Sequence, residues 1–506
     1  MSRLGSNILA NLLSNVWSTA LSLLLTPLFV YFLGVESYGL IGFYVSWVAI
    51  LGILDVGISG TASREIAWLA ARPAEASAIP SVVRSLEVAY WTIILALGAG
   101  LMAAVWSVGA GWFDTAGLPP AVVHQALMLM VVSLVIQVPS GLYIAGLMGL
   151  QRQVKGSGLL ALFGTIRGAG AVAVLWLVQP DIRFFFLWQI VASVLQTAAL
   201  RSVLVKAVRT EGHPARFSSH VLTSLRGYAG GMAAVTALGL VLTQMDKILL
   251  SRLVSLEAFG LYMLAWSVAS GLSRVAVPLL QAFGPRFTEL VSRGDEPALA
   301  GQVRIASQLT SVLLLPPSAL LMISSHDVLL AWIGDPAIAA KAAPLLSILT
   351  GGTVLSASSY PALSVLYSRK QLRPVIAVSA TAVVVLLPML VLAVNNAGAT
   401  GAAYCWVVSG LILYVAYQTL GLRGLPGIGG LAAVVRDFVK PALASLAVAL
   451  IGWSLSTLVH GRIQMAALLG VGLLAGWVAT LLVCRDVYKI AVNACRWNSI
   501  VTLWSA

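Results

Sequence analysis

Charged residues are scarce in this chain. Only 9% of its 506 residues are charged, while 59% are hydrophobic. A soluble domain carries about 25% charged residues, so the composition excludes an ordinary globular protein. Apolar runs of about 18 residues or more recur along the whole chain, and each is long enough to cross the core of a bilayer. The sequence therefore predicts a polytopic membrane protein.

Cysteine is also rare, and the usual signs of catalysis or cofactor binding are missing. The three cysteines, Cys405, Cys484 and Cys495, have neither metal-binding nor redox spacing. His124 and His326 stand alone near the ends of apolar segments, so no metal site is expected. The sequence has no glycine-rich phosphate loop with a lysine, and no cofactor is implied. The connections are too short for a separate domain, and no loop gathers the side chains that a glycosyltransferase needs.

The long apolar segments predict about fourteen membrane-spanning helices. They lie near residues 8–33, 38–60, 86–108, 124–147, 157–179, 184–205, 228–251, 257–284, 305–325, 344–367, 374–394, 400–420, 441–459 and 463–483. Basic residues concentrate in alternate connections, which places both termini in the cytoplasm by the positive-inside rule. The net charge of +13 is therefore largely topological, and no nucleic-acid partner is expected. The first segment lacks a small-residue cleavage site and is interpreted as a retained helix.

One short segment occurs twice in the chain. Val35-Glu36-Ser37-Tyr38-Gly39-Leu40 returns about 220 residues later as Leu256-Glu257-Ala258-Phe259-Gly260-Leu261. Two further pairs of segments keep nearly the same spacing, namely 112–114 with 332–335, and 151–155 with 369–373. A duplicated unit of roughly six spans is typical of secondary transporters, in which the substrate site lies between the halves.

The repeat divides the chain into two lobes. The predicted N-lobe, residues 1–206, and C-lobe, residues 228–420, have six helices each and are joined by a cytoplasmic linker at 207–227. An even number of spans per repeat relates the lobes by a pseudo-two-fold axis along the membrane normal. Two appended helices at 441–484 have no counterpart in the repeat. The cytoplasmic tail, 485–506, would be either an amphipathic helix at the membrane interface or a frayed end.

Three basic residues, Arg167, Lys247 and Arg274, fall inside predicted spans. A charge at the bilayer centre costs roughly 2.5–3.5 kcal/mol on insertion scales, so such residues usually face a cavity or a partner. Arg167 lies among the small residues of 164–170, which would let a helix or a ligand approach closely. Arg274 belongs to a polar stripe at helical spacing that begins at Ser267. We expect the three side chains to line a cavity, and the alternatives are ion pairing or snorkelling.

Acidic and amide side chains inside the spans provide further candidates. Asp55 and Asp246 are candidates for structural or coupling charges. Because adjacent helical residues point about 100° apart, Asp246 is not expected to neutralise Lys247 easily. Asn11 and Asn15 belong to a polar seam with i, i+4 spacing along the first span. That seam either lines the same cavity or holds neighbouring membrane helices together.

A set of motifs in both lobes carries a family resemblance. They are Thr26 to Gly39, Leu54-Asp55-Val56-Gly57-Ile58, Ser63-Arg64-Glu65-Ile66-Ala67, Met245-Asp246-Lys247-Ile248-Leu249-Leu250 and Phe259-Gly260-Leu261-Tyr262. Together they resemble the polysaccharide-biosynthesis (O-antigen type) flippases of the multidrug/oligosaccharidyl-lipid/polysaccharide exporter superfamily, over the chain to about residue 420. The appended helix pair is more similar to the fourteen-span flippases of lipid-linked peptidoglycan precursors, where such a pair borders a groove for lipid.

The resemblance implies a transporter of the bacterial inner membrane and not an enzyme. Its substrate would be an undecaprenyl-diphosphate-linked oligosaccharide moved to the outer leaflet, with a polysaccharide polymerase and glycosyltransferases as possible partners. A diphosphate carries about two negative charges, and guanidinium groups bind phosphate oxygens in pairs. Arg167, Arg274 and Lys247 would then hold the headgroup while the lobes rock. The alternatives are a multidrug cation antiporter of the same superfamily, which would need acidic cavity residues, and an integral membrane glycosyltransferase or ligase.

Overall fold

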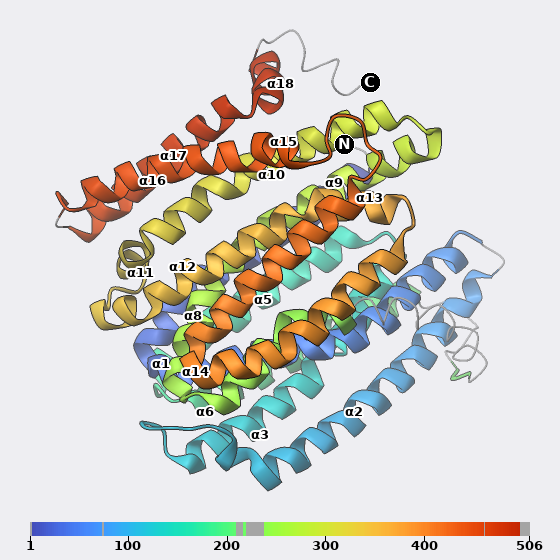
Figure 1. Ribbon diagram of the computed structural model, residues 1–506. Coiled ribbons are helices and arrows are strands. Elements are labelled where there is room, and N and C mark those ends of the chain that lie inside the picture. Colours follow the sequence, from blue (N-terminus) through green and yellow to red (C-terminus); the bar gives the residue numbers. More distant parts are fainter. Residues whose placement is uncertain (1–2, 73–74, 209–215, 219–236, 460, 496–506) are drawn as a thin grey trace. The chain divides into compact units, whose positions relative to one another are not determined.

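The computed structural model describes residues 3–72, 75–208, 216–218, 237–459 and 461–495 (Figure 1). Most residues in these ranges are helical, and the described residues form no β-sheet beyond an isolated bridge between Asp114 and Ser255. The expectation of an all-α polytopic membrane protein is confirmed. Contacts group the chain into two compact units, Met1–Gly260 and Leu261–Ala506. The division into repeat-based lobes and a linker stays a prediction.

The first unit holds the helices of the first half of the chain. These are α1 (Arg3–Ala70), the short η1 (Ala76–Ala78), α2 (Ile79–Trp112), α3 (Pro120–Gln137), α4 (Ser140–Gly149), α5 (Gln153–Leu177), α6 (Ile182–Val208) and a helix over 237–253. Gly34 breaks α1 into two helices, because its φ of 75° and ψ of 170° lie in a region that glycine adopts without strain. Pro139 separates α3 from α4, since it cannot donate to the helical ladder.

The second unit holds the remaining helices and the appended pair. They are α8 (Leu256–Ala269, whose first turn belongs to the first unit), α9 (Gly271–Arg293), α10 (Glu296–Ile323), α11 (Ser325–Ile333), α12 (Pro336–Ser358), α13 (Tyr360–Ser368), α14 (Leu372–Gly421), α15 (Leu431–Val434), the π-helical η2 (Val435–Val439), α16 (Lys440–Ser456), α17 (Arg462–Val483) and α18 (Arg485–Cys495). Gly398, with φ 56° and ψ −136°, breaks α14 in the way that Gly34 breaks α1.

The helices are long enough for the predicted number of spans. Within the described residues, 11 helical stretches are long and apolar enough to cross a membrane. Two of them, Leu13–Gly52 and Leu372–Gly421, contain the glycine breaks and each supply two crossings. Fifty helical residues would extend about 75 Å, more than twice the thickness of the hydrocarbon core. With the helix over 237–253, this accounts for about fourteen spans.

The two copies of the repeated segment touch each other inside the first unit. A Cβ at Gly39 would lie 2.9 Å from the carbonyl oxygen of Leu256 and 3.3 Å from the amide nitrogen of Gly260. A Cβ at Gly260 would collide with the carbonyl oxygen of Val35. Val35 and Leu256 hold the same place in the two copies, so the contact is reciprocal. Glycine is required on both sides because the backbones approach too closely for any side chain.

The appended pair is packed on α10 within the second unit, and Figure 1 shows α16 and α17 beside it. Thr480 and Ser445 share a hydrogen bond of 2.7 Å between these two helices. A Cβ at Gly476 would lie 3.1 Å from Pro316 of α10, so α17 lies close against that helix. Beyond the pair, the tail is helical over Arg485–Cys495, which excludes a frayed end for these residues.

Candidate functional site

Arg167 is fixed in the middle of α5 by close helix contacts. A Cβ at Gly168 would meet the side chain of Leu25 at 2.5 Å, and one at Gly170 would collide with Trp188 of α6. The expectation that small residues let neighbouring helices approach is therefore confirmed at these two positions. The Trp188 indole donates to the Ile166 carbonyl oxygen at 3.1 Å, which also ties α6 to this turn of α5.

The guanidinium of Arg167 has neutral partners. Its Nη2 donates to Gln196 Oε1 at 2.8 Å and to Ser193 Oγ at 3.3 Å, both on α6. Among the side chains that the structure describes, no carboxylate forms an ion pair with Arg167. The hydroxyl of Tyr44 lies close enough to interact with it electrostatically. Among the described residues, the positive charge in the middle of α5 is thus held by neutral hydrogen-bonding groups, which leave the guanidinium without a paired anion.

A band of uncharged polar side chains continues from Arg167 across neighbouring helices. Tyr44 donates to Gln137 and is 3.1 Å from Ser133, while Gln189 on α6 has a buried Oε1 without a hydrogen-bond partner among the described residues. The sequence reading missed this band. Gln189, Ser193 and Gln196 recur at helical spacing, so the same periodicity that marked the Arg274 stripe could have found it.

Lys247 differs from Arg167 because its charge is paired. Its side chain is 1% exposed, and Nζ lies 2.9 Å from both carboxylate oxygens of Asp246 and 2.7 Å from the Thr243 carbonyl oxygen. The expectation that Asp246 could not readily neutralise its neighbour is wrong. The directions of adjacent Cα–Cβ bonds do not limit a lysine, since its four-carbon stem can fold back along the helix.

Arg274 and part of the polar seam are exposed. Arg274 lies in the first turn of α9, and its side chain is exposed although it falls within a candidate membrane span. On α1, Asn15 and Ser18 are exposed as well, whereas the neighbouring Ser14 and Trp17 bind α5 through Ser157 and Thr165. Ser14 and Trp17 thus make these hydrogen bonds between α1 and α5, and Asn15 does not take part in them.

Two of the predicted site residues have side chains outside the described part of the structure. They are Asn11 and Asp55, and their roles stay predictions. The structure places Arg167, Lys247, Asp246 and Asn15 in the first unit and Arg274 in the second. Across the described residues, no group of three or more histidine, cysteine, aspartate and glutamate side chains could hold a metal ion.

Several hydrogen bonds join helix ends and loops near the repeated segment. Glu36 accepts hydrogen bonds from the amides of Ala116 and Gly117 at 3.0 to 3.1 Å. The amide of Leu256 donates to the Asp114 carbonyl oxygen at 2.7 Å. Arg252 Nη1 donates to the Gly111 carbonyl oxygen at 2.7 Å and to that of Trp112 at 3.1 Å. The predicted topology puts all of these loops outside, and we call this set of contacts the outer latch.

At the opposite end of the first unit, Glu87 of α2 collects three donors. Its carboxylate accepts hydrogen bonds from Arg201 Nε at 2.5 Å, from Arg84 Nη1 at 2.8 Å and from the Tyr143 hydroxyl at 2.8 Å. Glu87 is buried, while the two arginines are about half exposed. The buried carboxylate therefore fixes the ends of α2, α4 and α6 against one another.

These features define a multi-pass α-helical membrane protein with an internal repeat and a mid-span arginine. The sequence profile of the family described as "Polysaccharide biosynthesis protein" matches residues 4–291. That match covers more than half of the chain, and the chain belongs to this family. No curated relative matches the chain.

Solved structures share the fold. A lipid II flippase MurJ in an inward closed conformation has a TM-score of 0.71 and 13% identity, covering 95% of this chain and 99% of that one. An inward-facing multidrug resistance MATE family transporter of the MOP superfamily has a TM-score of 0.62 and 11% identity, covering 82% and 93%. A MOP superfamily transporter from Pyrococcus furiosus, described by a reverse polarity of its binding pocket, has a TM-score of 0.56 and 10% identity, covering 89% and 96%.

Proposed function

We propose that the protein is a flippase that moves an undecaprenyl-diphosphate-linked oligosaccharide across the bacterial cytoplasmic membrane for cell-surface polysaccharide biosynthesis. Membership of the polysaccharide biosynthesis family supports the pathway, and the shared fold of flippases and multidrug transporters supports transport over catalysis. The cycle would be alternating access around a cationic central cavity, with both termini in the cytoplasm.

The observation that carries the proposal is the mid-span charge of Arg167. A multidrug cation antiporter would need uncompensated acidic groups, but Asp246 is paired with Lys247. Arg167 instead meets only neutral described partners and keeps its charge available for a diphosphate. The exposed Asn15 and Ser18 in the first unit, and Arg274 in the second, support surfaces that water reaches within the spans, because polar side chains facing lipid at this depth would be costly. In this account the Asp246–Lys247 pair is structural.

The outer latch supplies the closed side of the cycle. Backbone hydrogen bonds and two glycines hold the outer loops of the first unit together, so substrate release to the outer leaflet requires the latch to separate. The contacts are few and lie at helix ends, where opening disturbs little of the buried core.

Translocation by the purified full-length protein tests the proposal. The protein would be reconstituted in liposomes that carry an undecaprenyl-diphosphate-linked oligosaccharide, and an impermeant glycosidase would report how much glycan reaches each face. A flippase would equilibrate the glycan between the two leaflets faster than in liposomes without the protein, and without added nucleotide. Uptake or efflux of organic cations without movement of glycan would favour the multidrug antiporter instead. Transfer of the glycan to an acceptor without transmembrane movement would favour a glycosyltransferase or ligase.

A further inference from the structure

The second unit contains a polar pocket that has no role in the proposed transport cycle. It lies between α10, the end of α12, the end of α14 and the start of the appended pair, and its polar lining residues are Arg304, Ser307, Ser311, Ser358, Tyr414, Gln418 and Asp437. The space open to water-sized molecules is about 30 Å³, within a wider depression of about 390 Å³. That is room for about two waters, or for the oxygens of one anionic group entering from the surface.

Two buried polar atoms in this pocket lack partners. Arg304 Nε and Ser358 Oγ make no hydrogen bond with any described residue, and Ser358 is only 6% exposed. The guanidinium of Arg304 has one long contact, from Nη2 to the Gly427 carbonyl oxygen at 3.5 Å. Leaving such groups unpaired is costly, so a ligand or water that accepts from both would stabilise the site.

The carboxylate in the pocket does not fill this role, because its charge is already paired with another arginine. Asp437 accepts from Arg436 at 2.6 and 2.8 Å and from Gln308 at 2.9 Å. Arg304 is not within ion-pair distance of Asp437 or of another described carboxylate. The positive charge of Arg304 is therefore the unmatched charge of the pocket.

Helices α2 and α10 lie at about the spacing of the repeated segments and can be compared by counting from the start of each helix. Glu87 is the ninth residue of α2 and Arg304 is the ninth residue of α10, the corresponding helix of the second repeat. Arg201 and Gln418 correspond in the same way. Arg201 is counted from the start of α6, and Gln418 holds the same place when α14 is counted from the residue after the Gly398 break. The first unit joins these places by a carboxylate–arginine pair, whereas the second has an arginine and an amide with a pocket between α10 and α14.

We propose that this pocket binds a phosphate group, supplied by the headgroup of an anionic phospholipid in the cytoplasmic leaflet. Arginine offers a planar set of donors to phosphate oxygens, and serine, tyrosine and glutamine side chains add single donors. A lipid is favoured over a free ion because the predicted topology puts this end of the spans at the inner surface, beside the basic residues Arg423 and Lys440.

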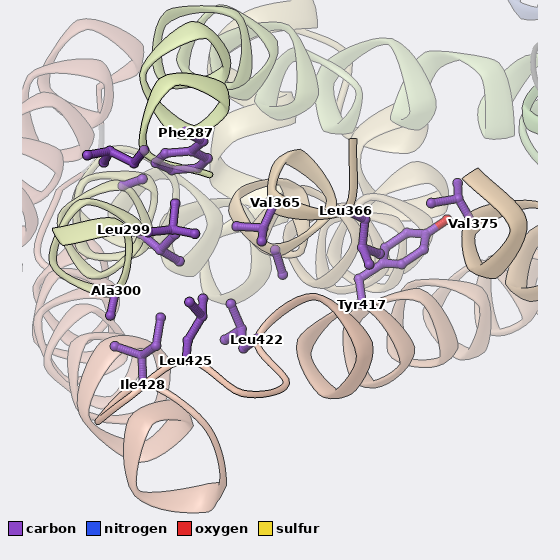
Figure 2. Close-up of a cluster of buried hydrophobic side chains, with 14 residues drawn as sticks. Phe287, Leu299, Ala300, Val365, Leu366, Val375, Tyr417, Leu422, Leu425 and Ile428 are labelled. Atoms are coloured by element: carbon purple, nitrogen blue, oxygen red, sulfur yellow. The ribbon is translucent and has the colours of Figure 1, made fainter. Parts of the chain in front are cut away.

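The wall of the pocket is held in place by apolar packing. Figure 2 shows Leu422, Leu425 and Ile428 of the loop after α14 directed toward Leu299 and Ala300 of α10, in one buried cluster. On the other side, Ser311 donates to the Asp437 carbonyl oxygen at 2.5 Å and holds η2 against α10. A bound phosphate would thus connect α10 and α14 with the appended pair.

Lipid retention and thermal unfolding of the full-length protein in detergent test this site. Native mass spectrometry would count bound phosphatidylglycerol, and unfolding would be followed with phosphatidylglycerol or with inorganic phosphate at matched ionic strength. We expect Arg304→Gln to weaken phosphatidylglycerol binding about tenfold or more and Ser358→Ala about threefold, since charged donors contribute more than neutral ones. Arg293→Gln is the matched control, because Arg293 is 64% exposed and pairs with Glu289 on the same unit.

The outcomes separate the possible occupants. Phosphatidylglycerol binding that Arg304→Gln and Ser358→Ala weaken, and Arg293→Gln leaves unchanged, supports the proposal. Stabilisation by inorganic phosphate alone would overturn the lipid as its source. No response to either anion, or equal responses in all variants, would mean that the pocket holds only water. If Arg304→Gln does not fold, Ser358→Ala decides, because that hydroxyl has no described partner to lose.

Discussion

Gly39 and Gly260 hold the same place in the repeated segment, and each packs against the backbone of the other copy. A Cβ at Gly39 would lie 2.9 Å from the Leu256 carbonyl oxygen, and one at Gly260 would collide with that of Val35. The two similar segments therefore do more than join helices at equivalent places. They form a self-complementary contact at the end of the first unit where the outer latch lies.

Gly260→Ala should destabilise the protein and weaken the latch. The clash is with a backbone oxygen, which cannot move away by a change of rotamer, and overpacking of this kind costs about 1–3 kcal/mol. The denaturation midpoint of the purified protein measures the effect. Gly60→Ala is the matched control, because Gly60 is also in a helix but a Cβ there would meet nothing within 4 Å. Equal midpoints for both variants would refute the contact.

A disulfide across the latch should stop transport reversibly. Asp114 and Ser255 form a β-bridge, which holds neighbouring Cα atoms about 5 Å apart, within the range that a disulfide spans. We expect Asp114→Cys with Ser255→Cys, in a background without the three native cysteines, to cross-link under oxidation and lose glycan translocation. Reductant should restore it. Undiminished translocation by the fully cross-linked protein would show that the latch stays closed throughout the cycle.

The spans and their breaks could be predicted from the sequence because they follow from hydropathy and chain length alone. The contact between the two copies could not, since a repeat shows which residues are equivalent and not which of them touch. Asp246 and Lys247 show a different failure. The angular rule considers only the directions of the Cα–Cβ bonds, but the long and flexible side chain of Lys247, 1% exposed to solvent, folds back to the carboxylate of Asp246.

The Asp246–Lys247 pair should behave as a structural unit. Lys247→Met leaves a buried carboxylate without its cation, which costs about 3–5 kcal/mol in other buried pairs, whereas Asp246→Leu with Lys247→Met removes both charges at a much smaller cost. Denaturation midpoints of the two variants measure the difference. We also expect the double variant to translocate glycan. A well-folded double variant that has lost translocation would instead put Lys247 in contact with the substrate.

Gln308 should control access to Cys484. Its amide joins Asp437 at 2.9 Å to Asp486 at 3.0 Å, and so holds α18 against α10. Cys484 is 1% exposed, and burial, assisted by Asp437 and Asp486, raises the pKa of its thiol to about 12. Because the thiolate is the reactive form, maleimide labelling of Cys484 at pH 8 should be very slow.

Gln308→Leu should release that restraint and speed the labelling of Cys484 at least about tenfold, since it removes the hydrogen bonds that join Gln308 of α10 to Asp437 and Asp486. Labelling of Cys405, which is also buried, serves as the internal control for global unfolding. An unchanged rate at Cys484 would show that α18 is held by apolar contacts, such as those of Val487, and not by Gln308.

The polar band around Arg167 marks the boundary of what the sequence could predict at the site. The cost of a charge within a span identifies Arg167 as a candidate site residue. The same argument does not identify Gln196 and Ser193, because they are neutral. Their role follows from the crossing of α5 and α6, which Gly170 and Trp188 set. A charged residue within an apolar segment can thus be identified from the sequence. The neutral side chains that bind it can be identified only from the packing of the helices.

Glycan translocation by Arg167 variants tests the central claim most directly. Arg167→Gln and Arg167→Lys would be compared with Arg183→Gln, whose arginine lies at the start of α6 and pairs with Asp181. In liposomes that contain the undecaprenyl-diphosphate-linked oligosaccharide, the account predicts at least about a tenfold slower rate for Arg167→Gln, an intermediate rate for Arg167→Lys and a normal rate for the control. Folded Arg167→Gln protein that moves the glycan at the wild-type rate would contradict it.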